Sequence, residues 1–177
     1  MRSFATTAAF ASFLAQKSRG ALVAQEAALL KGAKIIRDEA RGYLGHYQAG
    51  SGPFSEWADL APSTQAERDR LGFATDDPLY RTGELRAHVL ASAAPHGAAV
   101  GVPDLIVGSG GRGDPLRNIG KIARWLEFGT SKSGVSLIPP RSFLGRAAFE
   151  KGEEAAGEVG YNMGVYLTGM RVNRAPK

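Results

Sequence analysis

The sequence predicts an α+β fold with a long N-terminal helix, a small antiparallel sheet of about 3–4 strands, a short helix and a long C-terminal helix packed on the sheet. Two observations predict it. Apolar residues recur with helical spacing near both ends of the chain, and short apolar segments separated by glycine and proline fill the middle. The 177 residues, 44% of them hydrophobic, are enough for one domain with a core. We expect this domain to span 1–170, with N-terminal helices over 1–50, a mixed core over 51–143, a C-terminal helix over 144–170 and a basic tail over 171–177.

The N-terminal region is expected to form two helices. The first is short and amphipathic, with Phe10, Phe13 and Leu14 on one side, and its apolar stretch is too short for a convincing signal peptide. Gly20 is expected to separate it from a longer helix over about 21–47. The face of that second helix alternates steps of four and three residues: Leu22, Glu26, Leu29, Ala33, Ile36, Ala40, Tyr43 and Tyr47.

The middle of the chain predicts a short helix and then strands. After a Gly/Ser/Pro break over 48–54, Ser63 or Thr64 is positioned to cap a helix that runs to about Leu71 and ends at Gly72. Residues 75–78 form a predicted turn, and Thr82 and Gly83 would then turn the chain into the first strand. Three strands are expected in an antiparallel meander, at about 86–93, 97–102 and 104–108.

The next segment predicts a helix followed by an extended step. A glycine-rich loop over 108–115 precedes a helix over about 116–128, whose apolar side is Ile119, Ile122, Ala123 and Leu126. Gly129 is expected to end it in a left-handed cap, with Phe128 buried. Pro139 and Pro140 would then hold the chain extended.

The last helix is predicted over about 142–169, with Phe143 and Leu144 as its anchors. We expect Arg141 to bind a carboxylate, and Glu127 is the partner we predict for it. One side of the helix carries Ala148, Ala155, Val159, Met163, Tyr166 and Met170. Another side is small, which predicts the close approach of a second backbone: Gly152, Ala156, Gly160 and Gly164.

Composition argues against several classes of protein. Cysteine is absent and the three histidines, His46, His88 and His96, are scattered, so neither a metal site nor a cofactor is expected. No apolar run approaches the roughly 20 residues of a membrane span. The net charge of +5 is unevenly spread: residues 51–80 are mainly acidic and residues 81–146 mainly basic. Such blocks serve solubility, complementarity between neighbouring copies, or a surface that faces DNA.

Catalytic signals are weak, and we expect no enzyme. A phosphate-binding loop needs Gly-Lys-Ser/Thr, but Gly120-Lys121 is followed by Ile122, and no Gly-x-Ser-x-Gly segment exists. A hydrolase using Glu84 or Glu127 stays open as a lesser hypothesis. Another alternative is a nucleic-acid-binding module that uses a basic helix face. That face would be built from Arg112, Arg117, Lys121 and Arg124, the last three of which have spacings of four and three residues.

Four motifs occur in an order that resembles a known family. They are Trp57-x-x-Leu60-x-x-Ser63-Thr64, Pro78-Leu79-x-Arg81-Thr82-Gly83-x-Leu85-Arg86, Leu126-Glu127-Phe128-Gly129-Thr130 and Ile138-Pro139-Pro140-Arg141-x-Phe143-Leu144. Together they resemble the tail-completion, or head–tail joining, proteins of tailed bacteriophages, prophages and gene transfer agents, over about residues 21–170. The long segment 64–77, the loop 108–115 and residues 1–19 depart from that pattern.

The resemblance implies a structural, non-catalytic virion protein. It implies a homo-oligomer, a hexameric ring, in the neck or tail of a phage-like particle that is assembled in the bacterial cytoplasm. Its partners would be the head connector or adaptor and the tail terminator or tail-tube proteins, with non-specific contact to passing DNA and none to a membrane. The acidic and basic blocks would then be complementary faces of adjacent copies.

Overall fold

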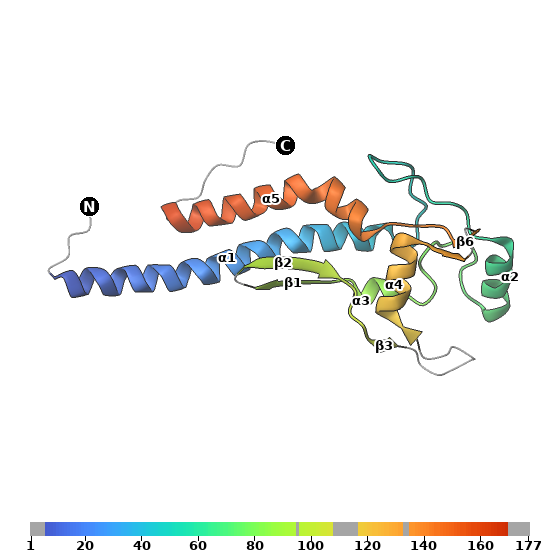
Figure 1. Cartoon of the computed structure of the whole chain (residues 1–177), viewed down its shortest axis with the longest axis horizontal. Helices are drawn as coiled ribbons and strands as arrows, with labels where there is room; N and C mark the ends of the chain where they lie inside the picture. Colours follow the sequence, from blue (N-terminus) through green and yellow to red (C-terminus); the bar gives the residue numbers. More distant parts are fainter. Residues whose placement is uncertain (1–5, 95, 108–116, 133–134, 170–177) are drawn as a thin grey trace.

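The computed structural model describes residues 6–94, 96–107, 117–132 and 135–169. Two long antiparallel helices, α1 (Thr7–Tyr43) and α5 (Leu144–Thr168), lie side by side, and the hairpin of β1 (Leu90–Ala94) and β2 (Gly97–Gly101) packs on α1 (Figure 1). We call this part the rod. The N-terminal turns of α1 extend beyond the end of α5.

The opposite end of the molecule holds the shorter elements, and we call it the platform (Figure 1). They are α2 (Pro62–Leu71), α3 (Glu84–His88), β3 (Ile106–Val107), β4 (Arg117–Asn118), α4 (Ile119–Phe128), β5 (Thr130–Lys132) and β6 (Val135–Ile138). The α+β class is therefore confirmed. The described strands form three antiparallel pairs, β1–β2, β3–β4 and β5–β6, in place of one sheet of three or four strands.

The helix α1 is continuous, so the predicted break at Gly20 is wrong. The side chain of Tyr166 lies on this glycine and donates a hydrogen bond to the carbonyl of Lys17 at 2.9 Å. A Cβ atom at position 20 would lie 2.5 Å from that hydroxyl oxygen. Gly20 therefore admits a side chain of α5 where the sequence suggested a helix end. The helix stops at Tyr43, before the predicted end near Tyr47, because Gly45 adopts a φ of +104° and its N–H bonds the carbonyl of Pro78.

The close contact between α1 and α5 is made at Gly32 of α1, and not by the small residues of α5 that the sequence suggested. A Cβ atom on Gly32 would meet the carbonyl oxygen of Ala155 at 3.0 Å and a methyl group of Val159 at 2.9 Å. By contrast, nothing lies within 4 Å of a Cβ atom on Gly152 or Gly160. The small side of α5 is open in this chain because α5 turns Ala155 and Val159 toward its neighbour.

The middle of the chain differs from the predicted meander. Residues 84–88 form α3 instead of the start of a strand, and Gly83, with a φ of +80°, caps this helix. The third strand, β3, pairs with β4 and not with β2. The helix α2 begins at Pro62 without a side-chain cap, so neither Ser63 nor Thr64 caps it. The prediction that Gly72 ends α2 is confirmed, since Gly72 adopts the left-handed conformation.

The main core lies where the C-terminal half of α1, α4 and the first turns of α5 meet. Its largest fully buried side chains include Phe143 and Leu44. Exclusion of these side chains from water fixes the rod on the platform. The buried cluster comprises Ala40, Tyr43, Leu44, Trp57, Leu79, Leu85, Val89, Val107, Ile119, Ala123, Phe143 and Ala147.

Candidate functional site

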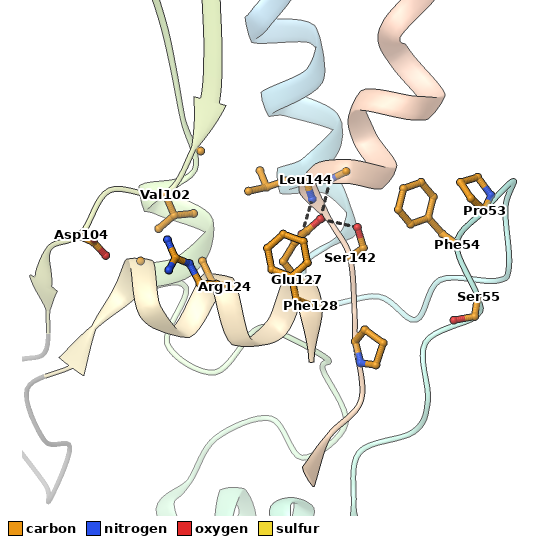
Figure 2. A pocket seen from close by; sticks show the side chains of 15 residues that line it. Pro53, Phe54, Ser55, Val102, Asp104, Arg124, Glu127, Phe128, Ser142 and Leu144 are labelled. Atoms are coloured by element: carbon orange, nitrogen blue, oxygen red, sulfur yellow. Dashed lines mark hydrogen bonds between the residues drawn. The ribbon is translucent and has the colours of Figure 1, made fainter. Parts of the chain in front are cut away.

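The side chain of Glu127, at the end of α4, caps the N-terminus of α5. One carboxylate oxygen accepts hydrogen bonds from the backbone N–H groups of Phe143 and Leu144, at 2.9 and 3.0 Å. The other accepts from the N–H of Gly145, at 2.8 Å, and from the hydroxyl of Ser142. Figure 2 shows this arrangement, which we call the Glu127 clamp. The negative charge meets the positive end of the helix dipole, and the first free N–H groups of α5 are satisfied.

Glu127 and Arg141 do not pair, so that prediction is wrong. The guanidinium of Arg141 donates instead to the carbonyl oxygens of Ala58 and Asp59, at 2.8 and 3.1 Å. Its backbone N–H bonds the carbonyl of Leu126 at 2.7 Å. Arg141 therefore ties the segment before α5 to both the platform loop and the end of α4.

The Phe128–Gly129 step also differs from the predicted cap. Phe128 is 76% exposed, not buried. Gly129 has φ 71° and ψ 178°, which is outside the left-handed helical region. A Cβ atom there would lie 2.7 Å from the carbonyl oxygen of Ile138 and 3.0 Å from the nitrogen of Pro140. Glycine is required at this position because the segment that precedes α5 passes directly over it.

The clamp borders a pocket of about 760 Å³ between α4, the segment before α5 and the loop near Phe54. In Figure 2, Phe128, Arg124 and Phe54 lie around it, and Glu127 and Leu144 lie at its wall. We call this the clamp pocket. Its lining combines aromatic rings with the exposed Arg124, which is a composition typical of a contact surface.

A second pocket, of about 520 Å³, lies on the platform, and we call it the motif pocket. Residues from all four sequence motifs line it, although they are spread from position 60 to position 141. The motif residues among its lining are Leu60, Thr64, Leu79, Arg81, Thr82, Gly83, Leu85, Leu126, Ile138, Pro139 and Arg141. The fold thus brings the four motifs together at one place. Thr82 is exposed there, and its hydroxyl bonds the carboxylate of Glu84 at 3.2 Å.

Two buried arginines of the motif pocket make no ion pair that the described contacts record. Arg68 donates to the carbonyl oxygens of Asp77, at 2.6 Å, and Ala74, at 3.3 Å. Arg141 bonds carbonyl groups as described above. Burial lowers the pKa of Arg68, and the nearby charge of Arg81 lowers it further. Burial is also the main cause that lowers the pKa of Arg141, with a further lowering from Arg68. Sequence reasoning missed Arg68, because the exposed and polar helix α2 has no apolar stripe that would reveal a buried position.

A third set of polar contacts fixes the start of α5 to α1. The hydroxyl of Tyr43 donates to the carboxylate of Glu150, which also accepts from Arg146 at 2.9 Å. The Tyr43 hydrogen bond is the main cause that lowers the pKa of Glu150. Burial first, and then the Glu150 contact, raise the pKa of Tyr43 well above its ordinary value of 10.0. No pattern in the sequence indicates this contact, since Tyr43 and Glu150 are far apart in the chain.

The basic cluster predicted for nucleic acid is divided in the structure. Arg117 lies in β4 and lines the motif pocket, because Asn118 caps α4 and the backbone before it is extended. Lys121 and Arg124 are exposed on α4, and Arg124 lines the clamp pocket. Arg112, with the rest of the loop 108–115, lies outside the described residues. The predicted single face of Arg117, Lys121 and Arg124 on one helix is therefore wrong.

Among the described residues no group of three or more His, Cys, Asp or Glu side chains is placed to hold a metal ion. In the same residues, no helix is both long and apolar enough to cross a membrane. The carboxylate of Glu127 is occupied by four donors within the chain, which favours a structural role over acid–base work. Comparison of the chain with family models, with curated proteins and with solved structures found no match.

Proposed function

We propose that this chain is a structural subunit of the neck of a tailed phage or phage-like particle, a tail-completion protein that assembles with copies of itself between the head connector and the tail tube. The observation that carries the proposal is the convergence of the four motifs. Three of them build a rigid joint, in which the end of α4, the Pro-Pro step and the Ala58–Asp59 loop are fixed to one another. Such a joint gives every copy the same shape, as an assembly of identical subunits requires.

Exposed apolar side chains support self-association through unlike surfaces. On the N-terminal half of α1, Leu14, Leu22 and Val23 are 46–69% exposed. On the platform, the large exposed apolar residues are Leu105, Ile106, Trp125, Phe128 and Leu137. Figure 1 shows the N-terminal turns of α1 and the platform elements toward opposite ends of the molecule. Two unlike apolar surfaces on one chain favour head-to-tail contacts, which close into rings when the rotation allows.

Charge is unevenly distributed on the platform, which holds most of both charge blocks. Residues 51–80 hold six acidic and two basic side chains, whereas residues 81–146 hold nine basic and four acidic ones. Opposite charge on adjacent copies would fix their register. Lys121 and Arg124, exposed on α4, would attract the phosphates of DNA that passes through the ring without reading its sequence.

Two variants test for unlike contacts between copies. Leu14→Gln changes the rod surface and Phe128→Gln changes the platform surface. If copies associate head to tail, each variant alone stays monomeric in sedimentation velocity, and a mixture of the two forms a discrete dimer through the remaining intact pair of surfaces. Glu153→Gln, at an exposed position outside both surfaces, is the matched control and should associate as the unchanged chain does.

Binding to the neighbouring proteins is the decisive test of the neck role, because a neck subunit need not form a ring before it meets its partner. The chain is mixed with a head-connector protein and a tail-tube protein of a tailed phage, and complexes are separated by size. We expect a complex with one of them, and loss of that complex with Phe128→Gln. Absence of binding to both, together with a monomeric mass at all concentrations, would overturn the proposal.

A further inference from the structure

The motif pocket has the lining of a binding site. Its wall is mainly apolar, with contributions from α3, α4, β6 and the loop at Leu60, and a few charged groups stand among these side chains. Its volume of about 520 Å³ suits a few side chains. The apolar side chains of the wall are Leu60, Leu79, Leu85, Ile119, Ile122, Leu126, Leu137, Ile138 and Pro139.

The charged groups of the pocket are mainly positive. Four arginines line it, Arg68, Arg81, Arg117 and Arg141, against the two carboxylates of Asp59 and Glu84. Arg68 and Arg141 are 7% and 5% exposed, and their guanidinium groups bond carbonyl oxygens, which carry no net charge. Their positive charges therefore remain uncompensated by those contacts. Arg81 lowers the pKa of Arg68, and Arg68 lowers that of Arg141, because like charges repel, while the carboxylates of Asp77 and Asp59 offset part of this repulsion.

Arg81 has hydrogen-bonding capacity left. Its Nε atom is buried without a hydrogen-bond partner in the described structure. Its guanidinium stacks on the ring of Phe73, 4.8 Å from the ring centre, and its Nη1 lies 3.6 Å from the carboxylate of Glu67, which is a long ion pair. A buried donor without an acceptor costs free energy, and a carboxylate accepts from a guanidinium in two parallel bonds.

We propose that the motif pocket binds an acidic segment of a separate polypeptide, with an apolar side chain against the pocket wall and a neighbouring carboxylate on Arg81. The apolar wall favours a peptide over nucleic acid, because a phosphate backbone offers nothing to cover such a wall. The chain itself has a net charge of +5, so electrostatic attraction favours an acidic partner over a second copy. This inference rests on the pocket alone and stands whether or not the chain acts in a phage neck.

The test is a calorimetric titration of the full chain with a short peptide of alternating leucine and glutamate. Two further peptides replace glutamate by glutamine, or leucine by serine. We expect the leucine–glutamate peptide to bind with a dissociation constant below about 1 mM and each replacement to weaken binding by about tenfold. Equal binding of the glutamine peptide, or no binding of the leucine–glutamate peptide at millimolar concentration, would overturn the proposal.

Three variants of the chain test whether the peptide binds in the motif pocket. Arg81→Gln should weaken binding by about tenfold, the loss expected for one charge-assisted hydrogen bond. Arg19→Gln, which removes the same charge from an exposed position on α1, should leave binding unchanged. Leu137→Ser, at the exposed rim of the pocket, should also weaken peptide binding, and it leaves the buried core unchanged. This variant replaces Arg81→Gln in the test if Arg81→Gln is poorly folded. Equal affinities of Arg81→Gln, Leu137→Ser and Arg19→Gln would refute the assignment.

Two other occupants are outcomes of the same experiments. If a DNA duplex binds and Arg81→Gln abolishes that binding while none of the peptides binds, the pocket is a phosphate site and the proposal is wrong. If Arg81→Gln abolishes self-association of the chain and no peptide binds, the occupant is a second copy, and the acidic polypeptide that we propose is wrong.

Discussion

Replacement of Glu127 by glutamine tests the clamp most directly. The change keeps the size of the side chain and removes its charge. One amide oxygen can still accept hydrogen bonds, but the NH₂ group would face backbone N–H groups of α5 that now lose their acceptor. Loss of an ordinary helix cap costs about 0.5–2 kcal/mol, and the charge–dipole attraction adds up to about 2 kcal/mol in a partly buried position.

Because Glu127 is only 9% exposed and serves three N–H groups and one hydroxyl, we expect a loss near the upper part of that range, about 3 kcal/mol. Such a loss is a large share of the about 5–15 kcal/mol by which domains are stable. Urea unfolding followed by far-UV circular dichroism measures it as a lower midpoint with an unchanged slope.

The matched control is Glu153→Gln, which makes the same chemical change at an exposed position of α5. It should shift the free energy of unfolding by no more than about 0.5 kcal/mol. Hydrogen exchange at the first turn of α5 should quicken in Glu127→Gln and not in the control. Equal stability of the two variants would refute the reasoning that the clamp holds the rod on the platform.

Four further outcomes are expected. Gly32→Ala should lower the free energy of unfolding by about 1–3 kcal/mol, since the new Cβ meets Ala155 and Val159. Gly42→Ala should raise it by up to about 1 kcal/mol, because nothing lies within 4 Å of the new Cβ. Thermal unfolding of the two variants measures both effects. The pKa of Glu150 is lowered in the fold, so its contribution to stability is present above pH 4.5 and lost below it, and Glu150→Gln should flatten that acid-side loss in a series of urea titrations. The pKa of Tyr43 is raised, so stability should fall above pH 10.0 as the unfolded chain ionises first, and less so in Tyr43→Phe. If DNA contacts α4, Arg124→Gln should reduce the salt slope of binding by about 0.9, and an unchanged slope would exclude that contact.

The sequence predicted the features that local pattern determines. Apolar spacing located the long helices and α4, and Gly72 marked the end of α2 because a left-handed residue after a helix favours glycine. Pro139 and Pro140 indicated the non-helical segment that precedes α5, because a residue before proline is disfavoured in a helix.

The remaining features depend on residues that are distant in the chain. Gly20 looks like a helix breaker until Tyr166 is known to lie on it. Glu127 suggested an ion pair because a nearby arginine is visible in the sequence, whereas the backbone N–H groups that it binds leave no mark there. Arg68 gave no sign of burial, and the motif pocket exists only once four separated motifs meet. Long-range contacts of this kind determine the candidate site.

The geometry of the Glu127 clamp also affects how the molecule responds to mechanical load. The N–H groups at the start of a helix point roughly along its axis, and Glu127 holds three of them within one turn. A pull on α5 along its axis would therefore stretch these bonds in parallel, and they would have to break together. A sideways pull at the far end of α5 would open the rod one turn at a time. The joint is thus strong against axial tension and weak against peeling.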